Sequence, residues 1–153
     1  IEQNNEYAMA YNYRGIAFVQ NNQFDKGLDD FNKAIEIDNE YAAAFKNKGI
    51  ALAQKKRYAG AIQALSKAID LDSEYAEAYF YRGQFYANQK KLNDAVRDLG
   101  RAVELGYQDP SAYFNLGVAY YNLGNRILSC ENLRLASEMG KKKKKKYFNQ
   151  VCQ

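Results

Sequence analysis

Apolar and small residues recur along this chain at the spacing of a helix face. From Tyr11 they step to Gly15 and Phe18, and a second run steps from Phe24 to Gly27. Steps of three or four residues are typical of the buried side of an α-helix. The polar stretch Asn-Asn-Gln between the two runs is long enough only for a tight turn. The pattern therefore predicts two antiparallel helices joined by a short turn.

The helix pair returns every 34 residues, in four copies without an insertion. Two columns hold small residues, namely Gly15, Gly49, Gly83 and Gly117 in one and Ala34, Ala68, Ala102 and Ala136 in the other. A third column holds large apolar residues, namely Phe31, Leu65, Leu99 and Leu133. Glycine inside a helix costs about 1 kcal/mol relative to alanine, so a glycine kept in register indicates a notch that a Tyr, Phe or Leu from a neighbouring helix fills. The repeat predicts an all-α fold in which each hairpin stacks on the next.

The pattern resembles the tetratricopeptide repeat family over most of the chain, in its period, its helix-turn-helix unit and its small and large columns. The resemblance implies an α-solenoid, a right-handed superhelix of four hairpins followed by a capping helix. We expect the repeats to span residues 8–41, 42–75, 76–109 and 110–140, with residues 1–7 as the remnant of a preceding repeat and residues 141–153 as a Lys-rich turn and capping helix.

One column departs from the family pattern. The residue before the notch glycine is often Leu in the family, and in this chain it is Arg14, Lys48, Arg82 and Leu116 in the four repeats. Sixteen residues further on, the chain has Asp30, Ala64, Asp98 and Asn132. An acid therefore follows only the two arginines. Because the planar guanidinium fork suits a carboxylate, we predict Arg-Asp pairs across the first and third hairpins.

The chain begins within a repeat. Ile1 aligns with Ile35, Ile69 and Val103, which belong to the second helix of a hairpin. We interpret the chain as a piece of a longer array, with a natural short N-terminus as the alternative. Because the N-terminal part of the parent protein is missing in this interpretation, the compartment stays open between the cytoplasm and a bacterial cell envelope. The Asn-, Lys- and Tyr-rich usage fits an AT-rich bacterial genome.

The last residues break the period. Tyr147, Phe148, Val151 and Cys152 form one apolar stripe, which predicts a helix that covers the last hairpin. If this helix runs antiparallel to the one before it, Cys130 and Cys152 come level and form a candidate thiol pair. We expect buried reduced thiols there rather than a disulfide, which needs a specific separation of the two Cα atoms.

Charge is concentrated in one run. Lys141 to Lys146 supply six of the 22 basic residues, and the rest of the chain carries 16 basic against 18 acidic residues, a net charge of −2. Like charges one helical turn apart disfavour a helix, so we expect a solvated turn there, with contact to RNA or an anionic membrane as the alternative. The nearly neutral remainder argues against a nucleic-acid or membrane partner.

The composition also excludes several kinds of chemistry. The chain has no His, which removes His-dependent acid-base catalysis and His metal sites. Two cysteines are too few for a four-ligand zinc site without other donors. We therefore expect neither an enzyme nor a cofactor. No apolar run reaches the roughly 18 residues that a membrane span needs.

In the family, residues beside the core positions of the first helices form a concave groove for partner segments. Mapped onto this chain, the groove comprises Asn12, Tyr13, Ile16, Gln20, Lys46, Asn47, Ile50, Gln54, Phe80, Tyr81, Gln84, Asn88, Phe114, Asn115, Val118, Tyr121 and Asn122. Amide side chains can pair with the backbone of a bound peptide, and exposed aromatic rings supply anchoring area.

Some family members use a set of Lys, Asn and Arg in this groove to hold acidic chaperone tails. Lys46 and Asn47 match part of that set, but the other places hold Ile16, Ile50, Glu77 and Tyr81. We therefore predict a non-catalytic scaffold that binds a peptide or partner-protein segment of another kind. The alternatives are an adaptor that binds anionic RNA or membrane through Lys141 to Lys146, and self-assembly through the array ends, including the N-terminal face.

Overall fold

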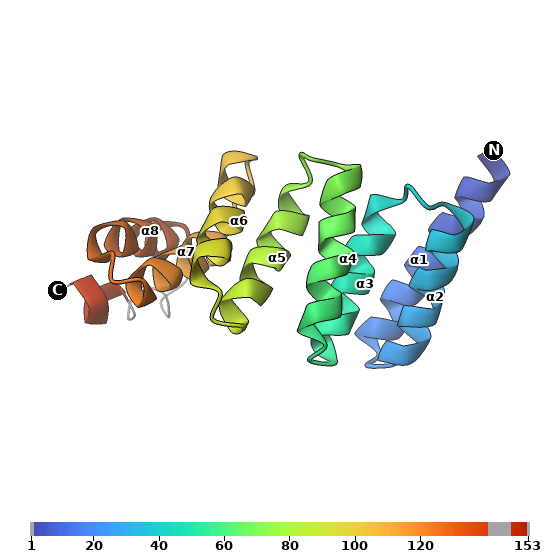
Figure 1. The fold of residues 1–153 in the computed structure, drawn as a ribbon, viewed down its shortest axis with the longest axis horizontal. Coiled ribbons are helices and arrows are strands. Elements are labelled where there is room, and N and C mark those ends of the chain that lie inside the picture. Colours follow the sequence, from blue (N-terminus) through green and yellow to red (C-terminus); the bar gives the residue numbers. More distant parts are fainter. Residues whose placement is uncertain (1, 141–147, 153) are drawn as a thin grey trace. The chain divides into compact units, whose positions relative to one another are not determined.

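The computed structural model of the chain describes residues 2–140 and 148–152, with side chains from residue 6 onward. These residues form helices and no strand (Figure 1), which confirms the predicted all-α class. In chain order the helices are α1 (Glu2–Gln20), α2 (Phe24–Ile37), α3 (Ala42–Gln54), α4 (Tyr58–Leu71), α5 (Ala76–Asn88), α6 (Leu92–Glu104), α7 (Pro110–Asn122) and α8 (Arg126–Met139). A short helical segment follows at residues 148–152.

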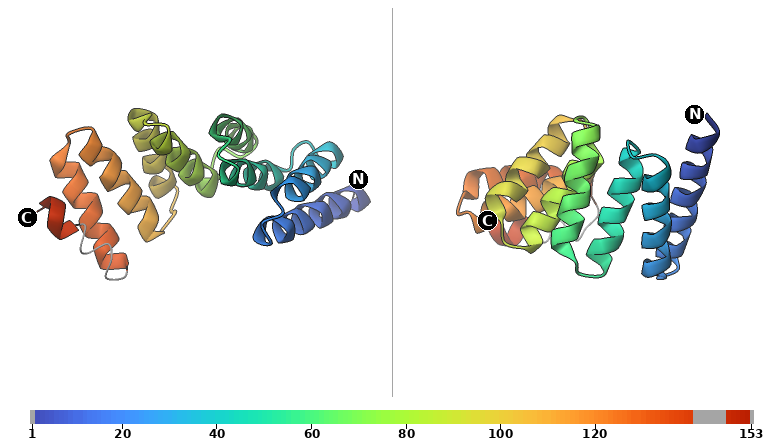
Figure 2. Two further views of the ribbon diagram at one scale, coloured as in Figure 1. Left: turned by 90° about the horizontal axis from the view of Figure 1, so that it is seen from below. Right: turned by 45° about the vertical axis from the view of Figure 1, so that its right-hand side comes forward.

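The chain divides into two compact units, residues 1–78 and residues 79–153. In the first unit α1 pairs with α2, α3 pairs with α4, and α2 also packs on α3. In the second unit α7 pairs with α8, and α6 packs on α7. Figure 2 shows these helix pairs from two further sides.

The turn inside each hairpin has the same backbone conformation. One residue of each turn has a positive φ, namely Asn22 at 59°, Lys56 at 59°, Lys90 at 60° and Gly124 at 78°. This left-handed conformation is the one with which helices commonly end. The tight turns predicted from the short polar stretches are confirmed.

Each notch glycine faces a large apolar side chain. A methyl group on Gly83 would lie 2.8 Å from Leu99 Cγ, and one on Gly49 would lie 2.9 Å from Leu65 Cγ. The full set of pairs is Gly15 with Phe31, Gly49 with Leu65, Gly83 with Leu99, and Gly117 with Leu133. All four large residues are buried. The notches are confirmed, but each is filled by the second helix of its own hairpin rather than by the next hairpin, because the tight turn brings residue i+16 back level with the glycine.

Alanines on the first helices allow the hairpins to stack within each unit. Ala44 and Ala51 of α3 are fully buried in the first unit, where α3 packs on α2. In the second unit Ala112 of α7 lies in one buried cluster with Ala95 and Leu99 of α6. Close approach of backbones at such small residues is what lets neighbouring helices pack without large voids.

The predicted Arg-Asp pairs are present in the first and third hairpins. Arg14 Nε lies 2.7 Å from Asp30 Oδ2, and its Nη2 lies 2.8 Å from Asp30 Oδ1. Arg82 makes the same two contacts with Asp98. Both carboxylates are buried, so each pair links the two helices of its hairpin at the edge of the core.

The N-terminus differs from the expectation. Residues 2–7 are the first turns of α1 rather than the end of a separate helix. In the later repeats, Asp38 Oδ1 accepts a hydrogen bond from the Glu40 amide and Asp72 Oδ1 accepts one from the Glu74 amide, which stabilises a turn before the next helix. The residue that aligns with Asp38 and Asp72 near the N-terminus is Asn4, which lies within α1 rather than in a turn before it.

The end of the chain is tied to α8. Cys130 and Cys152 form a disulfide with their Cα atoms 5.5 Å apart. Arg126 Nη2 also donates to the Val151 carbonyl oxygen at 3.1 Å, and Val151 is buried. The prediction of reduced thiols is therefore wrong. Residues 148–152 pack against α8 through the buried Val151, and the neighbouring Cys152 lies within bonding distance of Cys130. Lys141 to Lys146, for which we expect a solvated turn, lie outside the described residues.

Candidate protein-interaction surfaces

Two of the predicted groove residues in the first unit form a link between repeats. Asn12 of α1 is only 3% exposed. Its Oδ1 accepts a hydrogen bond from Asn47 Nδ2 of α3 at 2.8 Å, and its Nδ2 donates to the Tyr41 hydroxyl at 3.2 Å. The amides of Asn12 and Asn47 are thus engaged with each other, and Asn12 offers almost no open surface.

Lys46 is engaged in the same unit. Its Nζ lies 2.9 Å from Glu77 Oε2 and 5.8 Å from the centre of the Tyr75 ring. Burial alone lowers the pKa of Lys46, but the hydrogen bond to Glu77 and the neighbouring negative charges outweigh it, so the pKa is raised. The ammonium therefore stays charged and neutralised by a residue of this chain.

The other predicted groove residues of this unit lie on the first helix of each hairpin, α1 or α3, and we call this surface the first-helix face. Its residues are exposed to different degrees. Tyr13 is 61% exposed. Gln20 and Gln54 are also exposed, and Ile16 and Ile50 are half-buried. Apolar contact area and free amides therefore occur on the faces of both α1 and α3.

In the second unit, Phe80 is a core residue rather than a surface residue. It is 5% exposed, and its ring stacks on Tyr107 at 4.6 Å between centres. It also meets Tyr81 edge-on at 5.2 Å. Phe80 lies in the buried cluster with Leu99 and Leu116, so its ring stabilises the packing of α5, α6 and α7.

The remaining predicted residues of this unit lie on α5 and α7. Tyr121 is 48% exposed. Asn88 and Asn122 are also exposed, whereas the half-buried members are Tyr81, Gln84, Phe114, Asn115 and Val118. The first-helix face here is again a mixture of aromatic, aliphatic and amide groups.

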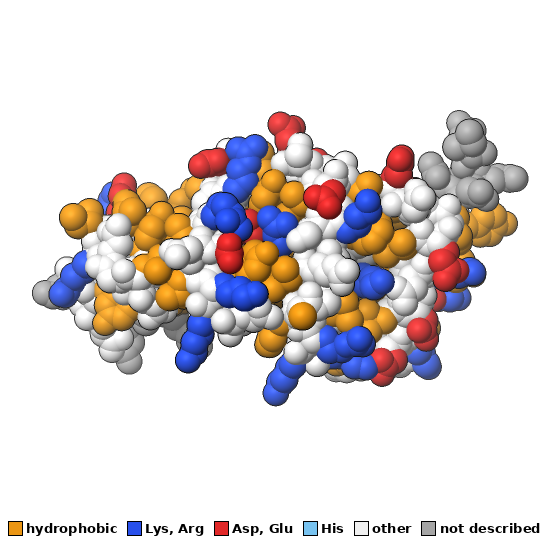
Figure 3. Space-filling model, viewed as in Figure 1, with side chains coloured by type: hydrophobic (Ala, Val, Ile, Leu, Met, Phe, Trp, Pro, Cys, Tyr) orange, Lys and Arg blue, Asp and Glu red, His pale blue; other side chains and the backbone are white. Residues whose placement is uncertain are grey.

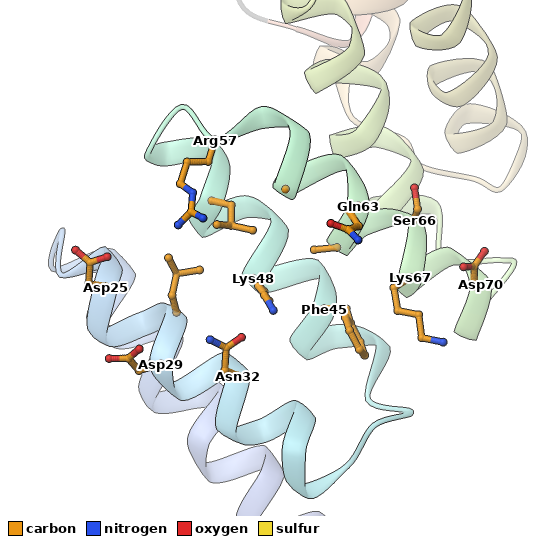
Figure 4. A pocket seen from close by; sticks show the side chains of 14 residues that line it. Asp25, Asp29, Asn32, Phe45, Lys48, Arg57, Gln63, Ser66, Lys67 and Asp70 are labelled. Carbon is orange, nitrogen blue, oxygen red and sulfur yellow. The ribbon is translucent and has the colours of Figure 1, made fainter.

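A second surface, which the groove prediction did not include, lies between α2 and α4 of the first unit. Figure 4 shows this cleft, with Asp25, Asp29 and Asn32 on the α2 wall and Gln63 and Lys67 on the α4 wall. The floor is formed by α3 through Phe45, Lys48 and Leu52. The cleft has a volume of about 810 Å³.

Charge on the surface is mixed. On the face drawn in Figure 3, Lys and Arg side chains are scattered among apolar and uncharged groups. Among the described residues, several basic side chains pair with acids, as Lys33 does with Glu36 and Arg134 with Glu138. None of the described helices combines the length and apolarity needed to cross a membrane.

Comparison with known proteins agrees with the repeat. Sequence profiles described as Tetratricopeptide repeat match residues 8–41 and 110–143, and one described as TPR repeat matches residues 49–90 and 83–124. No curated protein matches the chain by sequence.

Among solved structures, the first TPR of Spaghetti (RPAP3) bound to an HSP90 peptide is 24% identical, with a TM-score of 0.76 over 78% of this chain and 94% of that chain. MamA is 23% identical, with a TM-score of 0.80 over 92% of this chain and 80% of that one. Pseudomonas aeruginosa pilF is 21% identical, with a TM-score of 0.82 over 90% and 63%. These likenesses show an α-solenoid fold. By its sequence profiles and its helix hairpins, the chain belongs to the tetratricopeptide repeat family.

Proposed function

We propose that the chain is a non-catalytic protein-protein interaction scaffold whose first helices bind a segment of a partner protein. The observation that carries the proposal is the face of α1 and α3 that the core leaves open, with Tyr13, Ile16 and Ile50 together with the exposed amides of Gln20 and Gln54. An aromatic ring and two aliphatic side chains supply contact area, and amides can satisfy the backbone of a bound segment.

Pre-organisation supports this role. Helices held by filled notches and by the contact between Asn12 and Asn47 lose little freedom when a partner binds. The entropic cost of association then falls mainly on the partner segment. A rigid receptor of this kind needs no moving part and no bound cofactor.

The partner we propose is not an acidic chaperone tail. The Spaghetti structure was solved with an HSP90 peptide, and such a ligand needs free cations. In this chain Lys46 is paired with Glu77, and the aliphatic residues Ile16 and Ile50 hold nearby places. Binding through apolar area and amides is more consistent with these side chains than binding through a carboxylate clamp.

The test compares the amount of partner protein that the unmodified chain captures with the amount that each variant captures. We expect Ile50→Glu and Tyr13→Ala to lose most of the captured partner, while Lys33→Ala, an exposed change on α2, retains it. Equal capture by all three variants would show that the first-helix face is not the binding surface.

Salt separates this function from an adaptor that uses Lys141 to Lys146. Binding to apolar area and amides should respond weakly to salt, whereas binding of phosphates by lysines weakens steeply as salt rises. If capture collapses at moderate salt and disappears when the six lysines are changed to Gln, the adaptor replaces our proposal. Self-association of the pure chain that Tyr13→Ala abolishes would instead assign the α1 face to assembly.

A further inference from the structure

The second hairpin has a cation in the same column as Arg14 and Arg82, but it lacks the aspartate that pairs with the cation in the first and third hairpins. Arg14 and Arg82 each bind an aspartate 16 residues further on. Lys48 stands in the same column, but Ala64 stands where the aspartate would be. Within the described residues the side chain of Lys48 makes no hydrogen bond or ion pair, although Lys48 is half-buried.

The space left by the missing carboxylate opens into the cleft between α2 and α4. Lys48 and Ala64 both line this cleft, and Figure 4 shows the Lys48 side chain on its floor. The apolar side chains of Phe45, Leu28 and Leu52 line it as well. A cation that is partly removed from water and lies beside apolar groups attracts a carboxylate more strongly than a fully solvated one does.

The other charges of the cleft restrict what can enter. Asp25 is engaged by Lys55 in an ion pair. Asp29 and Asp70 are exposed acids on the two walls, and Arg57 and Lys67 are exposed cations that also line the cleft. Exposed charges are screened by water, so the half-buried Lys48 is the cation that attracts a carboxylate most strongly. Acids and bases are equal in number along the lining, which suits one carboxylate at Lys48 rather than a polyanion such as RNA.

We propose that this cleft is a second protein-binding site, which receives one Asp or Glu side chain of an extended partner segment. The carboxylate pairs with Lys48 and takes the place that Asp30 and Asp98 occupy in the first and third hairpins. The exposed amides of Asn32 and Gln63, from opposite walls, bind the backbone on either side of that residue. The site is separate from the first-helix face, and it does not depend on the function proposed for that face.

The first experiment uses 3-phenylpropionate as the probe and follows the backbone amides of the full chain by NMR. We expect saturable shifts centred on Lys48, Leu52 and Ala64, with a dissociation constant of order millimolar for so small a molecule. The neutral analogue 3-phenylpropanol should bind at least about fivefold more weakly, because it lacks the charge that Lys48 recognises.

Two variants examine the same atoms. Ala64→Asp installs the carboxylate of the first and third hairpins, so it should fill the site and weaken probe binding at least about fivefold. Lys48→Met should do the same by removing the cation, and Lys33→Met, an exposed lysine of α2, should change nothing. NMR spectra of each variant show whether the fold is retained.

A second arm distinguishes a protein segment from a free carboxylate. Immobilised chain should retain a pool of short peptides with a fixed central Glu more strongly than the matched Gln pool, and Ala64→Asp should abolish the difference. Binding of the probe that is unchanged in Ala64→Asp and Lys48→Met, or equal retention of the two pools, would overturn the proposal. Ile50→Glu should leave probe binding unchanged, which separates this test from that of the first-helix face.

Discussion

Arg82 and Asp98 are joined by two parallel hydrogen bonds across the third hairpin. Nε of Arg82 lies 2.6 Å from Oδ2, and Nη2 lies 3.0 Å from Oδ1. The Asp98 side chain is 2% exposed and that of Arg82 is 15% exposed. Burial lowers the pKa of Arg82, but the hydrogen bonds and charge of Asp98 outweigh it, so the pKa is raised and the guanidinium remains charged. The pair is thus a buried ionic contact between α5 and α6.

Removing one partner of a buried pair leaves an uncompensated charge, which typically costs 3–5 kcal/mol. We expect Asp98→Ala to lower the free energy of unfolding by about 3 kcal/mol, since Arg82 keeps some access to water. Asp30→Ala should cost clearly less, because the Arg14 side chain is 59% exposed. Urea denaturation of both variants provides the comparison, and equal losses would contradict the role of burial.

The disulfide should stabilise the C-terminal end of the chain. It joins two residues that are 22 apart in sequence. Closing a loop of this length lowers the conformational entropy of the unfolded chain, which stabilises the folded state by about 3 kcal/mol. We expect the double variant Cys130→Ser with Cys152→Ser to lose about that much stability.

The control for this prediction is the same variant under reducing conditions. Reductant should destabilise the wild-type chain and leave the serine variant unchanged. A wild-type chain whose denaturation midpoint does not respond to reductant would show that the bond contributes nothing to stability.

Alkaline pH should weaken the first unit. Burial raises the pKa of Tyr41 and of Tyr75 above the ordinary 10.0, and the pKa of Lys46 is also raised. The folded state therefore holds these protons more tightly than the unfolded state, so their stabilising contribution is present below about pH 10 and is lost as the pH rises through the folded values.

Urea denaturation at a series of pH values from about 8 to about 11 measures this loss. Tyr75→Phe removes one of the titrating groups, so its stability should fall less steeply with pH than that of the wild type. Identical slopes for the two proteins would contradict the assignment to Tyr75.

The repeat made most of the fold readable from the sequence. The notch glycines, the tight turns and the two Arg-Asp pairs are local relationships within one hairpin, and the period shows each of them more than once. The surface was less readable, because burial there depends on contacts between repeats. Asn12 is covered through Asn47, and Phe80 is buried in one cluster with Leu116 of the next repeat. Neither contact can be inferred from the residue types at the equivalent positions of the other repeats.

The cleft between α2 and α4 left one signal in the sequence. Lys48 lacks the acid that follows Arg14 and Arg82, and this absence marks the second hairpin as different from the first and third. Which groups surround the unpaired lysine could not be read from the columns, since the walls come from two hairpins. The disulfide could not be read either, because it depends on how closely residues 148–152 lie against α8.

Two glycine-to-alanine changes in the second unit test most directly whether filled notches hold the hairpins together. A methyl group on Gly83 would lie 2.8 Å from Leu99 Cγ and 3.0 Å from the Leu99 backbone nitrogen, whereas one on Gly100 of α6 would meet nothing within 4 Å. We expect Gly83→Ala to destabilise the chain by about 1–3 kcal/mol through overpacking. Gly100→Ala should stabilise it by up to about 1 kcal/mol through helix propensity. Urea denaturation that shows Gly83→Ala to be as stable as Gly100→Ala would contradict the account.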